Sequence, residues 1–449
     1  MLDLKGRRAL VRTGIAFVSA GALVAALTAT GGAAVRPRVT FPPYPTKLTA
    51  AEVALAAKYL GGRAGHAATG SPVTIGFLND DTGAPAYPEN YAGAKIAQSL
   101  INADLGGIRG HKLAFDECDV NSSTTASSCA AAMVAAHVKV VLTGTIIAQP
   151  DSAMYETLFA AHIPVIVGNG LTTTDFVPPS SPVRGTAVTY LPGSPGVVLG
   201  MAKFIGTGGT GHKPTHVTGF FLQGDSGSMT AFNALFKTSP FLKGVTVTGE
   251  QIAQPWSLPQ VEAAEAAAPA GSLFVPLLPV QQCISFAQGM TALSLHNTVV
   301  TTGLCFGKQL KTTLHTYPNG WYFGDYGINY FMYDKALLSS QQLAVYIASV
   351  TKFNPTIDYT GFAGPSFANV MTLVKFYNQL GPTATSAALA HLIQTFKGPQ
   401  WGISGPMACG HVAPIFPTIC GKYMGVSQFI GGKWRPIEAA YNNKLIDPF

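Results

Sequence analysis

The feature that most constrains this fold is an alternation of short apolar, β-rich runs with helix-like segments, which starts at Val73. Val73–Leu78 is typical of a buried strand, and Glu89–Ala103 is typical of an amphipathic helix that ends at Leu105-Gly106-Gly107. The pattern continues with expected strands at 112–115, 138–142 and 163–167 and expected helices at 127–136 and 153–161. This β-α-β-α order predicts a parallel sheet with helices on both faces.

A second set of the same kind follows the first. Its expected helices lie at 197–205, 230–237, 258–267 and 281–293, and its expected strands at 217–222, 245–252, 273–278 and 298–302. Two successive sets predict two similar α/β lobes. In the last third, Phe367–Tyr377 repeats apolar residues at helical spacing, and helices are also expected at 340–350 and 386–396. Gly421–Pro436 predicts a β-hairpin that turns at Gly431-Gly432.

Composition excludes two classes of protein. The chain has 449 residues, of which 47% are hydrophobic, and this apolar content is too high for a disordered polymer. Only 11% of the residues are charged, and the longest basic run lies at the N-terminus, where it has another explanation. Nucleic-acid binding depends on clustered Lys and Arg side chains and is therefore not expected.

The N-terminus has the pattern of an export signal. Residues 1–13 carry four basic side chains and one acid, and Gly14–Val35 is uncharged, with the small residues Gly32-Ala33-Ala34 near its end. This order predicts a secretory signal at 1–34, and hence a secreted, periplasmic or cell-envelope location. Arg7-Arg8 leaves the twin-arginine and general secretion routes open, and the uncharged stretch could stay as an anchor if uncleaved. No cysteine lies near the cleavage site, so no lipoprotein anchor is expected.

Residues 35–72 are expected to form a spacer rich in proline and glycine. Within this spacer, Thr49 followed by Glu52 is a capping-box pattern and predicts a short helix, which Gly61-Gly62 would end. The folded body is expected to begin near Val73.

The six cysteines fall into three local pairs. An even number of cysteines in an exported chain predicts disulfides, and proximity favours 118–129, 283–305 and 409–420. A zinc site is not expected, because the sequence has no C-x-x-C motif and Pro214 separates His212 from His216. No metal and no other cofactor is expected.

The stretch VTIGFLNDDTGAPAYPENYAGAKIAQSLINADLGGIRGHKLAFDECD (Val73–Asp119) resembles the opening of type I periplasmic binding proteins, the solute-binding subunits of ABC importers for branched-chain amino acids and amides. The matching pieces include Thr82-Gly83, Tyr87 and Gly106–Gly110. The later runs AHVKVVLTG and IPVIVGNG and the order of the second set also fit. The resemblance extends from Val73 to about Ile437.

The resemblance implies two Rossmann-like lobes with parallel central sheets, joined by a three-strand hinge. One lobe is expected at 73–190 plus about 325–395, and the other at 191–324 plus about 396–449. It implies a monomer without enzymatic activity that closes on a small molecule and delivers it to the ABC transporter permease at the membrane. Ligands of such sheets bind beside the carboxyl ends of the strands.

The resemblance also suggests the ligand-binding residues. Tyr87 matches an aromatic residue that lines the cleft of the family, and Gly170 and Thr172 match the backbone-plus-hydroxyl element that holds a ligand carboxylate in amino-acid binders. Gln149 lies near a second position of that kind. The remaining candidates follow strands of the second set and are Asp225, Ser226, Leu278 and Phe306.

Two departures from the family pattern bear on the ligand. The loop Thr145–Ala148 lacks the serine pair of amino-acid binders, and the loop Gly303–Phe306 lacks their glutamate, which holds the ligand ammonium. A buried ammonium without a counter-charge costs several kcal/mol. A small carboxylate, an amide, or an aromatic or aliphatic compound is therefore expected rather than a free amino acid. Asp225, Asp80 or Asp81 could each substitute for the missing acid, and that alternative stays open.

The main alternative function is that of a secreted serine hydrolase. Gly224-Asp225-Ser226-Gly227-Ser228 resembles the nucleophile segment of trypsin-like proteases, and Phe159–His162 resembles their histidine motif. Both segments lie within a β-α alternation, whereas that family folds as two β-barrels. Only 64 positions separate His162 from Ser226, which leaves little room for a barrel between them.

Overall fold

The computed structural model describes residues 47–83, 86–179, 186–325, 338–357, 359–402, 407–413, 415–421 and 424–436. The export signal expected at 1–34 lies outside these residues and stays a prediction. Within the described ranges, no helix is both long enough and apolar enough to span a membrane.

The first sheet is parallel throughout, with the strand order β2-β1-β3-β4-β5. Its strands are β1 (Gly70–Asn79), β2 (His111–Asp119), β3 (Val141–Thr143), β4 (Val165–Val167) and β5 (Ala187–Val188). The intervening helices are α2 (Glu89–Asp104), α3 (Ala126–Ala135), α4 (Ser152–Ala160) and α5 (Thr173–Phe176). The alternation predicted from the sequence is therefore confirmed for the first set, and the sequence prediction missed only the short elements α5 and β5.

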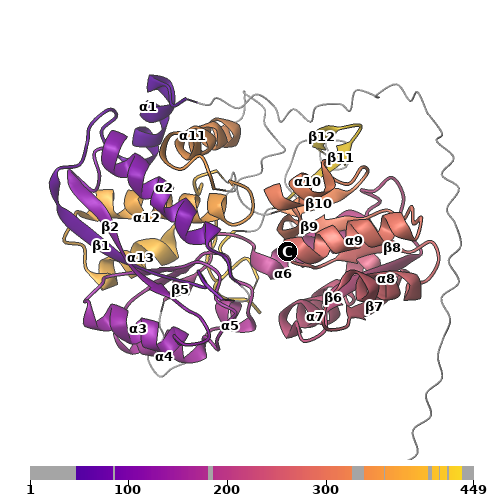
Figure 1. Ribbon diagram of the computed structural model, residues 1–449. Coiled ribbons are helices and arrows are strands. Elements are labelled where there is room, and N and C mark those ends of the chain that lie inside the picture. The colour runs from indigo at the N-terminus through magenta and orange to yellow at the C-terminus, as the bar shows by residue number, and fades with distance from the viewer. Residues whose placement is uncertain are drawn as a thin grey trace, which may run out of the picture. The chain divides into compact units, whose positions relative to one another are not determined.

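Helices cover both faces of this sheet (Figure 1). Ile75 and Phe77 of β1 belong to a core shared with α2 and α12 (Ala363–Leu380), whereas Leu78 belongs to a core shared with α3 and α4. Successive side chains of a strand point to opposite faces, so a strand covered on both sides appears in the sequence as an uninterrupted apolar run. Gly93 lets α2 approach α12 closely, because a Cβ at this position would overlap the backbone carbonyl of Ala363.

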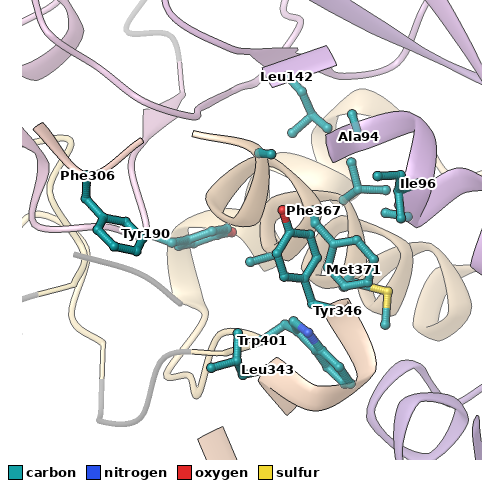
Figure 2. Close-up of a cluster of buried hydrophobic side chains, with 14 of the residues drawn as sticks. Ala94, Ile96, Leu142, Tyr190, Phe306, Leu343, Tyr346, Phe367, Met371 and Trp401 are labelled. Carbon is teal, nitrogen blue, oxygen red and sulfur yellow. The ribbon is translucent and has the colours of Figure 1, made fainter. Parts of the chain in front are cut away.

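Helix α12 contains the helix that the apolar spacing of 367–377 predicts, but it is buried on nearly all sides rather than on the apolar face alone. The Phe367 ring lies 5.0 Å from the ring of Tyr346, which belongs to α11 (Leu338–Phe353), and 6.4 Å from the ring of Trp401. Figure 2 shows these aromatic side chains packed together with Met371. Their burial anchors the C-terminal third of the chain to the first sheet.

The folded body begins earlier than the sequence suggests. Helix α1 (Ala50–Leu60) has the predicted capping box between Thr49 and Glu52, and Gly61 follows it in a left-handed conformation. Its buried residues Ala56, Ala57 and Leu60 belong to the same core as α2 and α12. The hydroxyl of Tyr59 lies 2.9 Å from that of Thr372 on α12. This helix is thus part of the packed body, and the expected start near Val73 is corrected.

The second set forms a parallel sheet with the order β7-β6-β8. Its strands are β6 (His216–Leu222), β7 (Thr246–Ile252) and β8 (Leu273–Pro276). The helices of this set are α6 (Gly193–Gly206), α7 (Ser226–Ala231), α8 (Leu258–Ala267) and α9 (Val280–Ala292), and α7 continues into a π-helical turn at Phe232–Phe236. Helix α7 starts four residues before the expected 230–237, because Asp225 provides its N-cap.

A mixed sheet with the order β12-β11-β10-β9 follows. It consists of β9 (Val300–Thr302), β10 (Tyr322–Asp325), β11 (Gly425–Ile430) and β12 (Lys433–Pro436), and a bridge between Phe274 and Val299 connects it to β8. The hairpin predicted at Gly431-Gly432 is confirmed. The remaining elements are α10 (Lys308–Leu314), α13 (Ser386–Thr395) and the 3-10 turns Pro240–Leu242 and Gly303–Cys305. The exact lobe boundaries and the three-strand hinge stay predictions.

All three predicted disulfides are present. Cys118 pairs with Cys129, Cys283 with Cys305, and Cys409 with Cys420. The first bond joins the end of β2 to α3, and the second joins α9 to the turn after β9.

Candidate functional site

The carboxyl edge of the first sheet carries a group of acidic side chains in loops that follow its strands. Asp80 and Asp81 follow β1, and Asp119 ends β2 beside them. The Asp119 carboxylate accepts hydrogen bonds from the backbone N–H groups of Asp81 (2.8 Å) and Thr82 (3.0 Å). Burial alone would raise the pKa of Asp119, but hydrogen bonds from Thr82 and Asn121 outweigh it, so the pKa is lowered and the carboxylate stays ionised.

Asp80 is fully buried and connects two loops. Its Oδ2 atom accepts hydrogen bonds from the backbone N–H groups of Ile147 (2.7 Å) and Ala148 (2.8 Å), which follow β3. Its Oδ1 atom has no hydrogen-bond donor among the described residues. Burial raises the pKa of Asp80 to about 6 against these two hydrogen bonds, and the charge of Asp119 adds to the increase. Burial and the neighbouring Glu117 raise the pKa of Asp81 to about 7.

Three asparagines join the loops at this edge, and the sequence analysis did not identify them. Asn90 donates to the Oδ1 atom of Asn79 (3.1 Å) and to the hydroxyl of Thr145 (3.1 Å), and it accepts a hydrogen bond from Asn169. The Oδ1 atom of Asn169 is buried and lacks a donor among the described residues. The sequence did contain a signal for two of them, namely their position at strand ends: Asn79 ends β1, and Asn169 lies two residues beyond β4.

Tyr87 is held firmly at this edge. Its backbone N–H donates to the Asp80 carbonyl (2.6 Å), its own carbonyl accepts from Asn79 (2.9 Å), and its ring lies 5.7 Å from that of Phe362. The pKa of its phenol is raised, chiefly by burial and then by the charges of Glu89 and Asp225. The structure thus places Tyr87 within electrostatic range of Asp225, which follows β6 of the second set.

Asp225 caps α7 through its Oδ1 atom, which accepts a hydrogen bond from the Ser228 backbone N–H (2.9 Å). The start of α7 also lies near the loop after β4, because a Cβ added to Gly227 would lie 3.3 Å from the Leu171 carbonyl oxygen. Ser226 is the first residue of α7, and its side chain is outside the described atoms. The loop after β4 therefore approaches the start of α7, and Tyr87 lies within electrostatic range of the N-cap of α7.

The loop that contains Gly170 and Thr172 is bonded to the chain's own carboxylates. The backbone N–H groups of Leu171 (2.9 Å) and Thr172 (3.0 Å) donate to Oδ2 of Asp175. The Thr172 hydroxyl donates to Oδ2 of Asp151 (2.6 Å) and accepts from the Asp175 backbone N–H (3.1 Å). Gly170 is buried against Asp175, since a Cβ on Gly170 would lie 2.9 Å from that of Asp175.

The two carboxylates of this loop are themselves buried. Asp175 also accepts a hydrogen bond from the Tyr155 hydroxyl (2.7 Å). Burial, followed by the charge of Asp151, raises the pKa of Asp175 to about 6, and burial raises the pKa of Asp151 as well. Threonine followed three residues later by aspartate is a capping-box spacing, and it was the sequence signal for this arrangement.

The other ligand-binding residues predicted from the sequence are placed less favourably for contact with a ligand. Gln149 is partly exposed and donates to the Asn121 carbonyl (3.1 Å). Leu278 is fully buried, and Phe306 is 1% exposed and stacks on Tyr317 at 5.0 Å. Figure 2 shows Phe306 among the buried side chains of the main core. Both side chains belong to the main hydrophobic core and pack against its apolar residues, so both are reinterpreted as core residues.

The hydrolase hypothesis finds no support in the position of His162. A helix that follows a parallel strand runs back across the sheet, so α4 begins at the carboxyl edge and leads away from it. His162 is exposed beyond the far end of α4, whereas Ser226 follows β6 at the carboxyl edge of its sheet. The two residues therefore lie at opposite edges and do not form a nucleophile–base pair.

No known protein-family model matches the chain, and no curated protein matches it in sequence. Solved structures match it in fold. The branched-chain amino acid transporter substrate-binding protein LivJ of Streptococcus pneumoniae, solved with isoleucine, is 15% identical with a TM-score of 0.60 over 81% of this chain and 98% of that one. The leucine-binding protein LivK of Thermotoga maritima is 14% identical with a TM-score of 0.62, over 84% of this chain and 99% of that one. An ABC transporter substrate-binding protein of Desulfitobacterium hafniense, solved with Leu, is 12% identical with a TM-score of 0.60, over 82% and 100%. The chain therefore has the α/β fold of type I periplasmic binding proteins, as the resemblance implies.

Proposed function

We propose that the chain is an exported, non-enzymatic solute-binding protein that captures a small molecule and delivers it to the permease of an ABC importer. The observation that supports this most is that loops of two α/β sheets approach each other: the Leu171 carbonyl lies beside Gly227 at the start of α7, and Tyr87 lies within electrostatic range of Asp225. Loops at the carboxyl ends of parallel strands are where ligands of open α/β sheets bind. Proteins of the same fold, including LivJ and LivK, are named for amino acid transport or binding.

The ligand belongs to the set expected from the sequence: a small carboxylate, an amide, or an aromatic or aliphatic compound, rather than a free amino acid. The loop Gly303–Phe306 contains no acidic side chain for a ligand ammonium. The Thr172 hydroxyl, expected to hold a ligand carboxylate, already donates to Asp151. A free amino acid would need both of these elements together, so its carboxylate would be poorly compensated even where another acid such as Asp225 paired with its ammonium.

Binding is coupled to closure of the protein. A ligand that contacts loops of both sheets favours the form in which those loops meet, by the difference between its affinities for the two forms. In this proposal the protein acts as a monomer outside the cytoplasm, and the permease recognises its closed form.

Mass spectrometry of the small molecules that co-purify with the full chain from its native host tests the function directly. Isothermal titration with the identified molecule then tests the site. Tyr87→Ala is expected to weaken binding roughly tenfold or more, because it removes an aromatic contact surface. Tyr87→Phe is the matched control: it retains the ring that packs on Phe362 and should retain most of the affinity.

Three outcomes would contradict the proposal. The first is a chain that carries no small molecule from its host and binds none of those offered. The second is equal affinity in the wild type and Tyr87→Ala, which would show that the site lies elsewhere. The third is hydrolysis of a chromogenic ester or peptide that Ser226→Ala abolishes, which would restore the hydrolase alternative.

A further inference from the structure

The backbone donors expected to bind a ligand carboxylate are occupied by the chain itself. The Leu171 and Thr172 N–H groups both bind the Asp175 carboxylate, and the Thr172 hydroxyl binds Asp151. Asp175 is 4% exposed and is further held by the Tyr155 hydroxyl. A ligand carboxylate could use these donors only by displacing a buried internal carboxylate, which would then lose both of its backbone hydrogen bonds at Oδ2.

The charged groups that surround this position are acids. Six aspartates lie at or just beyond the carboxyl ends of strands in the two sheets: Asp80, Asp81, Asp119, Asp151, Asp175 and Asp225. None of them forms an ion pair with a lysine, arginine or histidine within the described part of the chain. A second negative charge entering this environment would be repelled, whereas a cation or a neutral donor would not.

The edge also presents acceptors that lack donors. The Oδ1 atoms of Asp80 and Asn169 are buried without a hydrogen-bond donor among the described residues, and both residues are 0% exposed. A buried polar atom without a partner costs free energy, which a water or a ligand that reaches the atom removes. Both atoms are acceptors, so the partner that would satisfy them is a hydrogen-bond donor.

We infer that the ligand of this protein presents an amine or amide nitrogen as a hydrogen-bond donor to the carboxyl edge and carries no carboxylate. The inference rests on the proposed solute-binding function and narrows its ligand class by removing the carboxylates. Asp225 supplies the charge beside Tyr87, Asp80 and Asn169 supply the unpaired acceptors, and Asp175 excludes an acidic head group from the loop at Leu171.

Four probes with the same branched apolar body separate the head groups: 3-methylbutylamine, 4-methylpentanamide, 4-methylpentanoate and leucine. Titration calorimetry on the full chain is expected to show that the amine or the amide binds at least tenfold more tightly than the carboxylate and leucine. Tighter binding of the amine than of the amide would identify a cationic ligand, and tighter binding of the amide would identify a neutral one. Tighter binding of the carboxylate or of leucine would overturn the inference while leaving the solute-binding function intact.

Asp225→Asn tests the charge without disturbing the helix cap, because asparagine also caps helices well. If the amine is the preferred probe, this variant should lower the affinity for the amine about tenfold and change the affinity for the amide less than threefold. Asp104→Asn is the control, because Asp104 lies away from this edge and pairs with Lys352. If no probe binds, the head group of the molecule that co-purifies with the protein tests the inference instead. A carboxylate in that molecule overturns the inference. A protein that binds no probe and carries no small molecule overturns the proposed function as well.

Discussion

Replacing Glu265 with methionine should stabilise the protein, and the gain should grow with pH. Glu265 lies on α8, is 2% exposed, and neither of its carboxyl oxygens has a hydrogen-bond partner among the described residues. Its carboxyl group lies against α9 at Gly289, where an added Cβ would overlap Oε2. Burial, followed by the charge of Glu262, raises the pKa of Glu265 to about 8, well above its usual value near 4.5.

The sign of the effect follows from proton linkage. Between about pH 4.5 and pH 8 the folded protein retains a proton on Glu265 that the unfolded chain has lost, so the free energy of unfolding falls as the pH rises through this window. At about 1.4 kcal/mol per pH unit, the rise of the pKa from 4.5 to about 8 corresponds to a loss of about 5 kcal/mol in the free energy of unfolding. Access of water to the carboxyl group reduces this loss to about 2–3 kcal/mol. Below the window, the unpaired but neutral carboxyl still costs about 1 kcal/mol or more.

Urea unfolding followed by fluorescence at pH 5, 6.5 and 8, with the disulfides intact, measures this effect. Glu265→Met should gain about 1 kcal/mol at pH 5 and about 3 kcal/mol or more at pH 8, relative to the wild type. Glu262→Gln, on the same helix but partly exposed, should change stability by about 0.5 kcal/mol or less. The reasoning is refuted if the wild type and Glu265→Met show the same pH dependence.

Three further predictions follow from the fold and the site. Gly93→Ala should destabilise the protein by about 1–3 kcal/mol in the same unfolding assay, because the new Cβ meets the Ala363 backbone, whereas Lys95→Ala on the exposed face of α2 should have little effect. Peptide mapping without reductant should recover the three local disulfides, and six free thiols would contradict it. Lowering the pH from 7.5 to 5.5 should weaken the binding of an amine ligand several-fold and that of an amide less, since burial raises the pKa of Asp80 to about 6 and this acceptor gains a proton in this range. Constant amine affinity in calorimetry across that range would contradict the assigned role of Asp80.

The sequence predicted the regular elements well because their patterns are local. Each strand of the first sheet except β5 corresponds to a short run that the sequence analysis identified, and α2 and α12 correspond to long periodic segments. The errors fall where a local pattern is incomplete. The sequence places helix α1 in a spacer outside the folded body, because its flanking segments are rich in proline and glycine. In the structure, Ala56 and Leu60 of this helix are buried in the main core.

Site residues were harder to predict, because a strand end indicates a position but not an orientation. Tyr87 follows β1, Asp225 follows β6, and the two lie within electrostatic range of each other. Leu278 and Phe306 also follow strands, but both side chains are packed inside the core. An apolar side chain at a strand end has the same sequence signature whether it lines a binding site or fills the core, so only the structure separates the two cases.

The loop after β4 shows how one residue can change the chemistry of a backbone segment that offers hydrogen-bond donors. Gly170 and Thr172 alone predict a carboxylate site, because they combine free backbone donors with a hydroxyl group. Asp175 lies three residues after Thr172, at the spacing at which a capping side chain reaches back to the first N–H groups of a helix. Its carboxylate therefore stands where a ligand carboxylate would otherwise bind, and it is covalently tethered, so it pays no entropy of association and outcompetes a free anion at any ordinary concentration. Selectivity against acids thus follows from a local helix cap, while selectivity for a donor depends on Asp80, Asn169 and Asp225, which only the folded chain brings to the same edge.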